Sequence, residues 1–380
     1  MPSPLRAASL PEPLLVAAVT ARPLAASARR GGFAAVVLDL FTDADTRALG
    51  YPCRNVCRDD ALRFDTRRLI AAAEELAPPG RCAGVVLGAG FEADTRLMAR
   101  LAEGRRLLGN SPETVAAIKD PARFFALLDR LGIAHPETRL APPTDAAGWL
   151  AKRRGGAGGT HVVAAAGAHR GSDVYYQRFQ AGRSLSVLFL ADGRRACVVG
   201  WNEQWPASAA TPFLYGGGMS GVAPEQALQR EIAADLNRIV AETGLIGLNG
   251  LDYVAGDDSW GVIEINPRPT APLEYYDADW PQGLLAAHIE ACDGRLPAVR
   301  PPAGAVRGHL IIFAARQVAV RAGFRFPAWC RDVPNPGTAI PAGGPVCTVH
   351  AESADANQLR QLIASRQAEV ESLLISEAAA

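Results

Sequence analysis

The stretch VIEINPRPT, residues 262–270, places polar side chains inside an apolar, strand-forming segment. Its valine and isoleucines favour a buried β-strand, yet alternate positions carry Glu264, Asn266 and Arg268. Side chains two positions apart on a strand share one face, so these three side chains point the same way. Prolines then end the run. A strand that aligns polar side chains at its end predicts a functional site there.

The segment LDYV, residues 251–254, predicts the neighbouring strand of a hairpin and supplies a second carboxylate. A three-residue loop at 257–259 would place Asp252 directly opposite Glu264. Facing carboxylates repel each other unless a cation or a proton lies between them. Oxygen ligands from Asp252, Glu264 and Asn266 fit a hard cation such as Mg²⁺ or Mn²⁺. The alternative, two carboxylates that face solvent, fits the apolar neighbours poorly.

Lysine is nearly absent from the chain, since only Lys119 and Lys152 of the 39 basic residues are lysines. Lysine offers a compact point charge where arginine offers a planar fork, so these two positions are candidates for sites that require lysine. Lys152 precedes GGAGG at 155–159, a loop whose backbone N–H groups can hold phosphate oxygens. A Walker A loop would place its lysine after the glycines. Chance retention on the surface and a flexible turn are the alternatives.

The predicted fold class is α/β, with α+β character in the middle of the chain. Residues 1–111 alternate strands with helices, which indicates an N-terminal parallel α/β domain. Residues 112–298 hold a helix broken at Asp120-Pro121, the glycine loop and several strand pairs, with a polar, aromatic loop predicted over 201–224. Residues 299–380 are rich in Pro and Gly and predict a small β-rich C-terminal domain with a terminal helix.

The composition narrows the classes of partner. A chain of 380 residues that is 49% hydrophobic and 21% charged is typical of a soluble protein with two or three domains. Its net charge of zero argues against nucleic acid, and no apolar run is long enough to predict a membrane span. The seven cysteines form no C-x-x-C pair, which favours reduced thiols and a cytoplasmic location.

Lys119, Lys152 with its glycine loop, YYQRFQAG (175–182) and the pair LDYV…VIEINPR together resemble the ATP-grasp superfamily, over roughly residues 10–290. The resemblance implies a pre-ATP-grasp domain followed by a two-lobed ATP-grasp domain, with ATP and Mg²⁺ (or Mn²⁺) as cofactors. It implies that Asp252, Glu264 and Asn266 hold the metal. Arg268 and Lys152 take the catalytic roles of steadying the transferred phosphoryl group and contacting the phosphates. The implied nucleotide contacts are Lys119, Lys152, Gly156, Gly158, Gly159, Gln177, Arg178, Phe179 and Gln180.

One position departs from the family pattern. The early lysine of the family often follows an aspartate, whereas here Lys119 precedes Asp120 and Pro121 takes the next place. Substrate contacts are sought in the predicted aromatic loop and the strand before it. Core packing or a simple turn is an equally good interpretation there. These candidates are Arg183, Trp201, Trp205 and Tyr215.

The family resemblance implies an ADP-forming carboxylate–amine ligase that activates a small carboxylate, such as glutamate, as an acyl phosphate. A narrower likeness, through LDLFTDADT (38–46) and GAGFE (88–92), is to relatives of tyramine–glutamate ligase in one-carbon cofactor biosynthesis. The expected partners are a small carboxylate and a small amine, and a homodimer is left open. The alternatives are an ATP-grasp carboxylase, an acid–thiol ligase and a non-catalytic nucleotide-binding regulatory protein. A dehydrogenase is excluded because no complete G-x-G-x-x-G follows the first strand.

Overall fold

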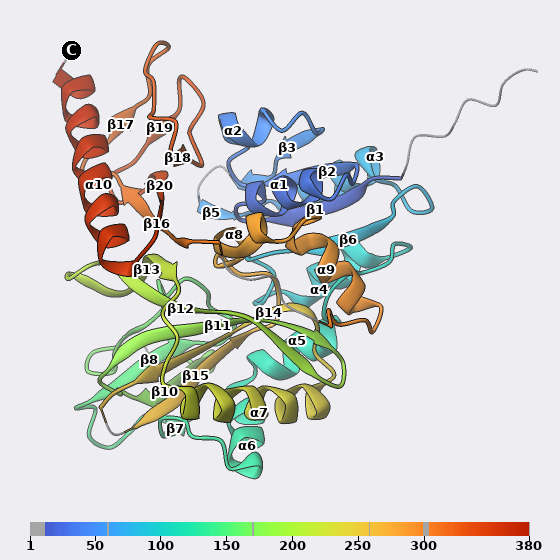
Figure 1. Ribbon diagram of the computed structural model, residues 1–380, viewed down its shortest axis with the longest axis vertical. Coiled ribbons are helices and arrows are strands. Elements are labelled where there is room, and N and C mark those ends of the chain that lie inside the picture. Colours follow the sequence, from blue (N-terminus) through green and yellow to red (C-terminus); the bar gives the residue numbers. More distant parts are fainter. Residues whose placement is uncertain (1–11, 59–60, 169–170, 258, 299–303, 380) are drawn as a thin grey trace, which may run out of the picture.

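The computed structural model describes residues 12–58, 61–168, 171–257, 259–298 and 304–379. The first part of the chain forms the parallel sheet that its alternating pattern predicts (Figure 1). The strand order is β3-β2-β1-β6, and the strands β1 and β2 are buried at every position, which explains their uninterrupted apolar runs. The elements of this part are β1 (Leu14–Ala18), α1 (Arg22–Arg30), β2 (Ala35–Asp39), α2 (Ala44–Arg47), β3 (Cys53–Asn55), β4 (Cys57–Arg58), β5 (Ala61–Phe64), α3 (Thr66–Leu76), β6 (Gly84–Leu87) and α4 (Thr95–Ala102).

Two short helices and a small sheet follow. Ser111 caps the first helix and Asp120 caps the second, each accepting a backbone N–H three residues on, so the predicted break at Asp120-Pro121 is confirmed. The small antiparallel sheet has the order β7-β10-β8-β9 and carries Lys152 on its strand β8. The elements are α5 (Pro112–Lys119), α6 (Pro121–Leu131), β7 (Thr138–Arg139), β8 (Trp149–Arg153), β9 (Val163–Ala164) and β10 (Val174–Arg178).

An eight-stranded sheet with the order β15-β14-β11-β12-β13-β16-β20-β18 forms the centre of the molecule. Its strand β11 is apolar on both faces. Val187 and Phe189 pack with helices α6 and α7, whereas Leu188 and Leu190 pack with α1 and α9 on the other face. The elements are β11 (Arg183–Asp192), β12 (Ala196–Ser208), β13 (Thr211–Ser220), α7 (Gln226–Thr243), β14 (Ile246–Ala255), β15 (Trp260–Asn266), α8 (Leu273–Tyr276), η1 (Asp277–Asp279) and α9 (Gly283–Cys292).

The C-terminal strands extend this central sheet, because β16 pairs with β13 and β20 pairs with β16. Figure 1 shows the long helix α10 along these strands, opposite the N-terminal sheet. In the part of the chain that the structure describes, no helix has the length and apolar character needed to cross a membrane. The elements are β16 (Val306–Phe313), β17 (Val318–Ala319), β18 (Cys330–Arg331), β19 (Ala339–Ile340), β20 (Pro345–Ser353) and α10 (Ala356–Ala379).

The loop predicted over 201–224 is wrong. Most of this stretch forms β12 and β13, which pair from Asn202↔Ser220 to Ser208↔Thr211. A glycine of this stretch allows close strand packing. A Cβ at Gly217 would lie 2.2 Å from the carbonyl oxygen of His309 on β16.

Candidate active site

The hairpin of β14 and β15 brings two predicted metal ligands face to face. Asp252 pairs directly with Glu264, so both side chains point to one side of the sheet. Nearer the turn, Ala255 pairs with Trp260, one residue short of the expected partner, and a bulge beside Asp252 restores the register. The three-residue loop predicted around Asp258, which itself lies outside the described residues, is therefore wrong. The predicted carboxylate pair is nevertheless correct, since the bulge absorbs the offset.

Asn266 and Lys119 complete a polar cluster around this pair. Asn266 donates from Nδ2 to Asp252 Oδ2 at 2.9 Å, and its Oδ1 accepts from the Lys119 ammonium at 3.2 Å. Lys119 also donates to the Glu264 carboxylate. The ammonium thus contacts oxygens of two predicted metal ligands. Gln204, which sequence reasoning did not select, donates to the other Asp252 oxygen at 2.9 Å.

The electrostatics of this cluster fit a cation site. Burial and the adjacent Glu264 carboxylate raise the pKa of Asp252 to about 7. Burial alone would also raise the pKa of Glu264, but the Lys119 ammonium outweighs burial and lowers it. Asp252 therefore resists ionisation, first because it is buried and then because Glu264 lies beside it, although Lys119 and Arg268 act in the opposite direction. Oxygen donors that include two facing carboxylates suit a hard divalent cation such as Mg²⁺.

Strand β8 carries Lys152 toward the same cluster. Lys152 is 8% exposed, and its ammonium donates to Gln177 Oε1 on β10 at 2.6 Å. Burial lowers the pKa of Lys152 to about 8, while the charges of Glu264 and Asp252 act in the opposite direction. Both lysines of the chain therefore lie within electrostatic reach of the carboxylate pair.

A cavity of about 30 Å³ joins the cluster to the glycine loop. Lys119 and Glu264 line one part of it, and Gly155, Gly156 and His161 line another. Burial lowers the pKa of His161, which favours the neutral imidazole. The cavity thus places an ammonium, a carboxylate and flexible backbone around a common space.

The rest of the glycine loop lies against strand β13. Tyr215 donates its backbone N–H to the Gly158 carbonyl at 3.0 Å. A Cβ at Gly159 would lie 1.6 Å from the Phe213 carbonyl oxygen, and Gly159 has φ +74°. A side chain at Gly159 would therefore push the loop away from β13.

The segment Gln177–Gln180 leads from the small sheet to the central one. Gln177 is buried, whereas Phe179 is half exposed. The backbone N–H groups of Arg178 and Phe179 both donate to protein carbonyls, those of Glu137 and Gly148, at 2.8 Å. These two donors are therefore occupied by the protein itself. Gln180 reaches the Val254 carbonyl through its side chain at 3.4 Å.

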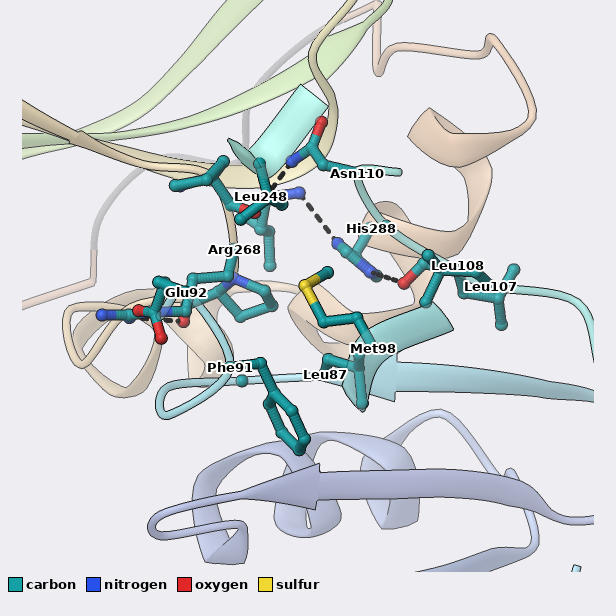
Figure 2. Close-up of a pocket in the computed structure, with 15 residues that line it drawn as sticks. Leu87, Phe91, Glu92, Met98, Leu107, Leu108, Asn110, Leu248, Arg268 and His288 are labelled. Carbon is teal, nitrogen blue, oxygen red and sulfur yellow. Dashed lines mark hydrogen bonds and ion pairs between the residues drawn. The ribbon is translucent and has the colours of Figure 1, made fainter. Parts of the chain in front are cut away.

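Arg268 links the cluster to the N-terminal sheet. Its guanidinium donates to Asn266 Oδ1 at 3.4 Å and also to Glu92, a carboxylate that follows β6. Figure 2 shows this ion pair beside a small cavity that Phe91 and Met98 also line. Burial alone would raise the pKa of Glu92, but Arg268 and Lys119 outweigh it and lower the pKa to about 2. The Glu92 carboxylate is therefore ionised throughout the physiological range.

Sequence reasoning missed Glu92 and Gln204. Glu92 ends the stretch GAGFE, which follows an apolar strand. Ligands often bind at this edge of a parallel sheet, and that position was the only indication of a role for Glu92. Gln204 lies in the predicted aromatic loop that was considered for substrate contacts, but nothing in that stretch indicated that its side chain faces Asp252. Its position on β12 becomes visible only once the strand pairing is known.

The predicted substrate residues lie in different surroundings. Trp201 packs in the core with α6 and α7, and Trp205 packs beside Met219 in a smaller cluster. Arg183 is mostly exposed and pairs with Glu203 at 3.1 Å. Tyr215 is the exception, since its hydroxyl lies 3.0 Å from His309 Nε2. The structure therefore does not bring these four side chains together.

Comparison with protein families identifies the domain that contains the cluster. Residues 118–272 match the family model described as an ATP-grasp domain. The chain is 28% identical over 237 residues to the carbamoyl phosphate synthase large chain of Deinococcus deserti, which covers 54% of this chain. The chain spans only 23% of that relative's length.

Solved structures show the same fold over nearly the whole chain. Biotin carboxylase of Campylobacter jejuni, in a complex with a β,γ-ATP compound, aligns with a TM-score of 0.69 at 13% identity, covering 92% of this chain and 89% of that one. An L-amino acid ligase from Bacillus licheniformis also aligns with a TM-score of 0.69, at 12% identity, with coverages of 95% and 98%. The fold is thus that of these two enzymes, and the polar cluster lies inside the matched ATP-grasp domain.

Proposed function

We propose that this protein, which carries an ATP-grasp domain, is an ATP- and Mg²⁺-dependent ligase that joins a small carboxylate to an amine. One observation carries the proposal. Asp252, Glu264 and Asn266 lie together with Lys119, and a single cavity connects Glu264 and Lys119 to the glycine loop. Cation ligands, a lysine and a phosphate-binding loop around one space are what transfer of a phosphoryl group from ATP requires.

Each group of residues at the site has its own role in this proposal. Lys152, Lys119 and the loop glycines Gly156, Gly158 and Gly159 bind the phosphates, and the segment Gln177–Gln180 receives the adenine. Mg²⁺ or Mn²⁺ held by Asp252, Glu264 and Asn266 would supply positive charge that offsets the charge of the phosphates. Arg268, oriented by Glu92, steadies the transferred phosphoryl group. Lys152 and Arg268 thus carry the catalytic charge that the protein itself provides.

The reaction has two steps. A carboxylate oxygen of the substrate attacks the γ-phosphorus, and the bond to ADP breaks, which leaves an acyl phosphate. The amine nitrogen then attacks the acyl carbon, the bond to phosphate breaks, inorganic phosphate leaves with the electron pair, and the proton lost by the nitrogen goes to that phosphate or to solvent, which leaves an amide. Positioning and charge neutralisation account for most of the rate in such transfers. An amino acid such as glutamate is the carboxylate that we propose, in a pathway of cofactor biosynthesis.

We propose a cytoplasmic location for this activity. All seven cysteines are free thiols in the structure, which suits a reducing compartment. The partners in this proposal are the two small substrates.

A screen of substrates tests the function. Purified protein with ATP and Mg²⁺ is combined with pools of amino acids and other carboxylates, each with a pool of amines, and the release of ADP and phosphate is measured. The proposal expects ADP release that needs one carboxylate and one amine together. A separate arm replaces the amine with bicarbonate or with a thiol, because biotin carboxylase shares the fold. Turnover in that arm alone would favour a carboxylase or an acid–thiol ligase, and no turnover in any arm would favour a regulatory protein.

A further inference from the structure

A second polar cluster lies outside the cavity of the proposed metal ligands. Glu274 on α8, His309 on β16 and His350 on β20 each contribute one atom, a carboxylate oxygen or a ring nitrogen, and these three atoms lie within 4.8 Å of one another. Figure 1 shows α8 between the N-terminal sheet and the C-terminal strands. The cluster therefore forms where three distant parts of the chain meet.

The two histidines offer unused nitrogens. Within the described part of the chain, His309 Nδ1 and His350 Nε2 are buried without a hydrogen-bond partner. His309 is 3% exposed, and its other nitrogen lies 3.0 Å from the Tyr215 hydroxyl. Burial lowers the pKa of His309 to about 3 and also lowers that of His350. Both rings are neutral, and in the tautomer that carries the proton on the other ring nitrogen each of these two atoms offers a buried lone pair to a donor that the described part of the protein does not supply.

The charges around the cluster favour a cationic ligand. Arg22 contacts three carboxylates, those of Glu274 at 2.8 Å, Asp332 at 2.8 Å and Asp45 at 3.4 Å. One guanidinium thus offsets only part of the local negative charge. Glu274 and His350 keep side-chain exposures of 17% and 22%, which leaves an approach from solvent.

The spacing of the three atoms can be compared with the spacing that an ammonium ion or a transition metal requires. Three acceptors around an ammonium, with hydrogen bonds of about 2.9 Å, would stand about 4.7 Å apart in tetrahedral geometry. Ligands of zinc at about 2.0 Å would stand only about 3.3 Å apart. His350 Nε2 lies 3.9 Å from Glu274 Oε2, and no separation exceeds 4.8 Å. The separation of 3.9 Å lies between these two values, so the spacing admits hydrogen bonds from an ammonium as well as a metal ion, and the charges and the place of the cluster in the fold decide the proposal below.

Strand pairing places this cluster on the same side of the central sheet as the proposed metal ligands. Gln204 pairs with Gly218, Gly218 with His309, and His309 with His350. Directly paired residues point to the same face, and Gln204 bonds Asp252 on that face. Two strand spacings, about 10 Å, separate Gln204 from His309. Gly218 contributes no side chain to the space between them.

We propose that Glu274, His309 and His350 bind the primary ammonium group of the amine substrate. This inference rests on the proposed ligase function, since only a ligase of that kind needs an amine beside its acyl phosphate. The three acceptors match the three N–H donors of an alkylammonium ion. The location, on the face that carries the proposed metal ligands, suits a site that holds the amine as its ammonium before the nitrogen loses a proton to solvent and reaches the activated carboxylate.

Methylammonium chloride is the probe for this site, with the ring ¹⁵N signals of His309 and His350 followed by NMR in the wild-type protein. We expect saturable shifts of both rings, with a dissociation constant of roughly millimolar size for so small a ligand. Tetramethylammonium has the same charge and no N–H donor, so it is expected to cause no shift. Equal shifts with both ions, or none with methylammonium, would overturn the proposal.

Variants identify the residues and the kind of ligand. Glu274→Gln and His350→Gln are each expected to weaken the binding of methylammonium at least tenfold. The control is His135→Gln, at a histidine that hydrogen-bonds Asp129, and it should leave the affinity for methylammonium unchanged. Retention of the wild-type affinity in both cluster variants would contradict the assignment. Binding of Zn²⁺ at micromolar concentration, with loss of the methylammonium response, would replace the ammonium site with a metal site.

The proposed function and this inference can fail separately. Glu264→Gln is expected to lose ATP turnover while it keeps wild-type methylammonium binding. If a carboxylate and an amine support turnover, the Glu274→Gln and His350→Gln variants should raise KM for the amine at least tenfold with KM for ATP unchanged. Turnover with an unaltered KM for the amine would overturn the proposed ammonium site but would leave the proposed ligase function standing. Methylammonium binding that needs Glu274, without turnover for any pair of substrates, would support the cation site. It would also contradict the ligase function, and with it the assignment of the site to an amine substrate.

Discussion

The ammonium of Lys119 lies where a divalent cation would share oxygens with Glu264 and Asn266. Asp252, which Lys119 does not contact in any described hydrogen bond, is the carboxylate whose pKa rises to about 7. A divalent cation bound by Asp252 and Glu264 would favour the ionised form of Asp252. At the scale of residues, the cluster is therefore a buried pair of carboxylates of which Lys119 contacts only Glu264 in the described hydrogen bonds.

Lys152 gives a prediction about pH. Burial lowers its pKa to about 8, so the ammonium is charged below that pH and becomes neutral as the pH rises through it. Phosphate binding favours the charged form. The affinity for ATP is expected to be constant near pH 7 and to fall by up to about tenfold per pH unit above pH 8. Calorimetric titration of ATP between pH 7 and 9.5 measures this change.

The matched variant for that titration is Lys152→Met. It should bind ATP more weakly at pH 7 and should lose most of the dependence on pH above 8. The same decline in the variant and in the wild-type protein would mean that another group titrates.

The pair of Glu92 and Arg268 gives a prediction about stability. Both side chains are largely buried, at 4% and 13% exposure, so Glu92→Ala would leave a charged guanidinium without its partner. The free energy of unfolding is expected to fall by about 3 kcal/mol, measured by urea unfolding at pH 7. The double variant Glu92→Ala with Arg268→Ala should lose less free energy of unfolding than the sum of the losses in the two single variants. Strict additivity would show that the pair is not coupled.

Residues of the site differ in how far the sequence predicts them. The pair of Asp252 and Glu264 was predictable because a hairpin links them within 12 positions, although a bulge altered the turn. Glu92 meets Arg268 across 176 positions, a contact that no local pattern encodes. The cluster of Glu274, His309 and His350 depends on three separate segments in the same way.

At the scale of elements, the glycine loop depends on its contact with β13. Gly159→Ala would place a Cβ against the Phe213 carbonyl at a φ that favours glycine. We expect KM for ATP to rise between about tenfold and a hundredfold, since small misplacements in a binding loop have large effects. Steady-state kinetics with the substrate pair found by the screen would measure it.

Gly158→Ala is the matched control for this change. Gly158 has φ +66°, but no atom lies within 4 Å of its added Cβ, so only backbone strain of about 1 kcal/mol is expected. If both variants behave alike, contact with β13 is not what positions the loop.

The β12–β13 hairpin shows why some elements escape sequence reasoning. The stretch WNEQWPASAATPFLYGGG has polar, aromatic and glycine residues without a clean alternation. Its strand form depends on partners at both sides, namely β11 and β16. By contrast, α5 and α6 carry caps that act locally, and the break between them was predicted from Asp120-Pro121.

At the scale of the whole molecule, buried histidines lie where separate segments of the chain contact one another. His288 on α9 accepts the Leu248 N–H at 2.8 Å, and its other nitrogen lies 3.0 Å from the Leu108 carbonyl, near the cavity of Figure 2. One helix thus holds a strand of the central sheet and the segment that follows the N-terminal sheet. Figure 1 shows α9 between these two parts. No local sequence pattern predicts these two contacts of His288, whereas the alternating pattern of the N-terminal residues predicted the parallel sheet.

His288 gives a prediction about acid stability. Burial lowers its pKa from 6.5 to about 4, so between these values the unfolded chain binds a proton that the folded chain does not. The free energy of unfolding therefore falls as the pH drops from 6.5 toward 4, by up to about 3 kcal/mol from this residue. Urea unfolding at pH 7 and pH 4.5 measures the loss.

The variant His288→Gln is expected to be less stable at pH 7 and to lose less stability on acidification. His309, whose pKa burial lowers to about 3, keeps its own share of the acid sensitivity in that variant. An unchanged difference between the two pH values would exclude His288 as the source.

The most direct test of the central claim is Mg²⁺-dependent trapping of an acyl phosphate with hydroxylamine. Hydroxylamine attacks the acyl carbon in place of the amine and yields a hydroxamate, so only the carboxylate must be supplied, beginning with glutamate and the amino-acid pool. The wild-type protein and Glu231→Gln, a change at an exposed residue of α7, are expected to form hydroxamate and ADP in equal amounts. Glu264→Gln should lose both by at least about a hundredfold. Hydroxamate formation that persists in Glu264→Gln, or that proceeds equally well without Mg²⁺, would contradict the account.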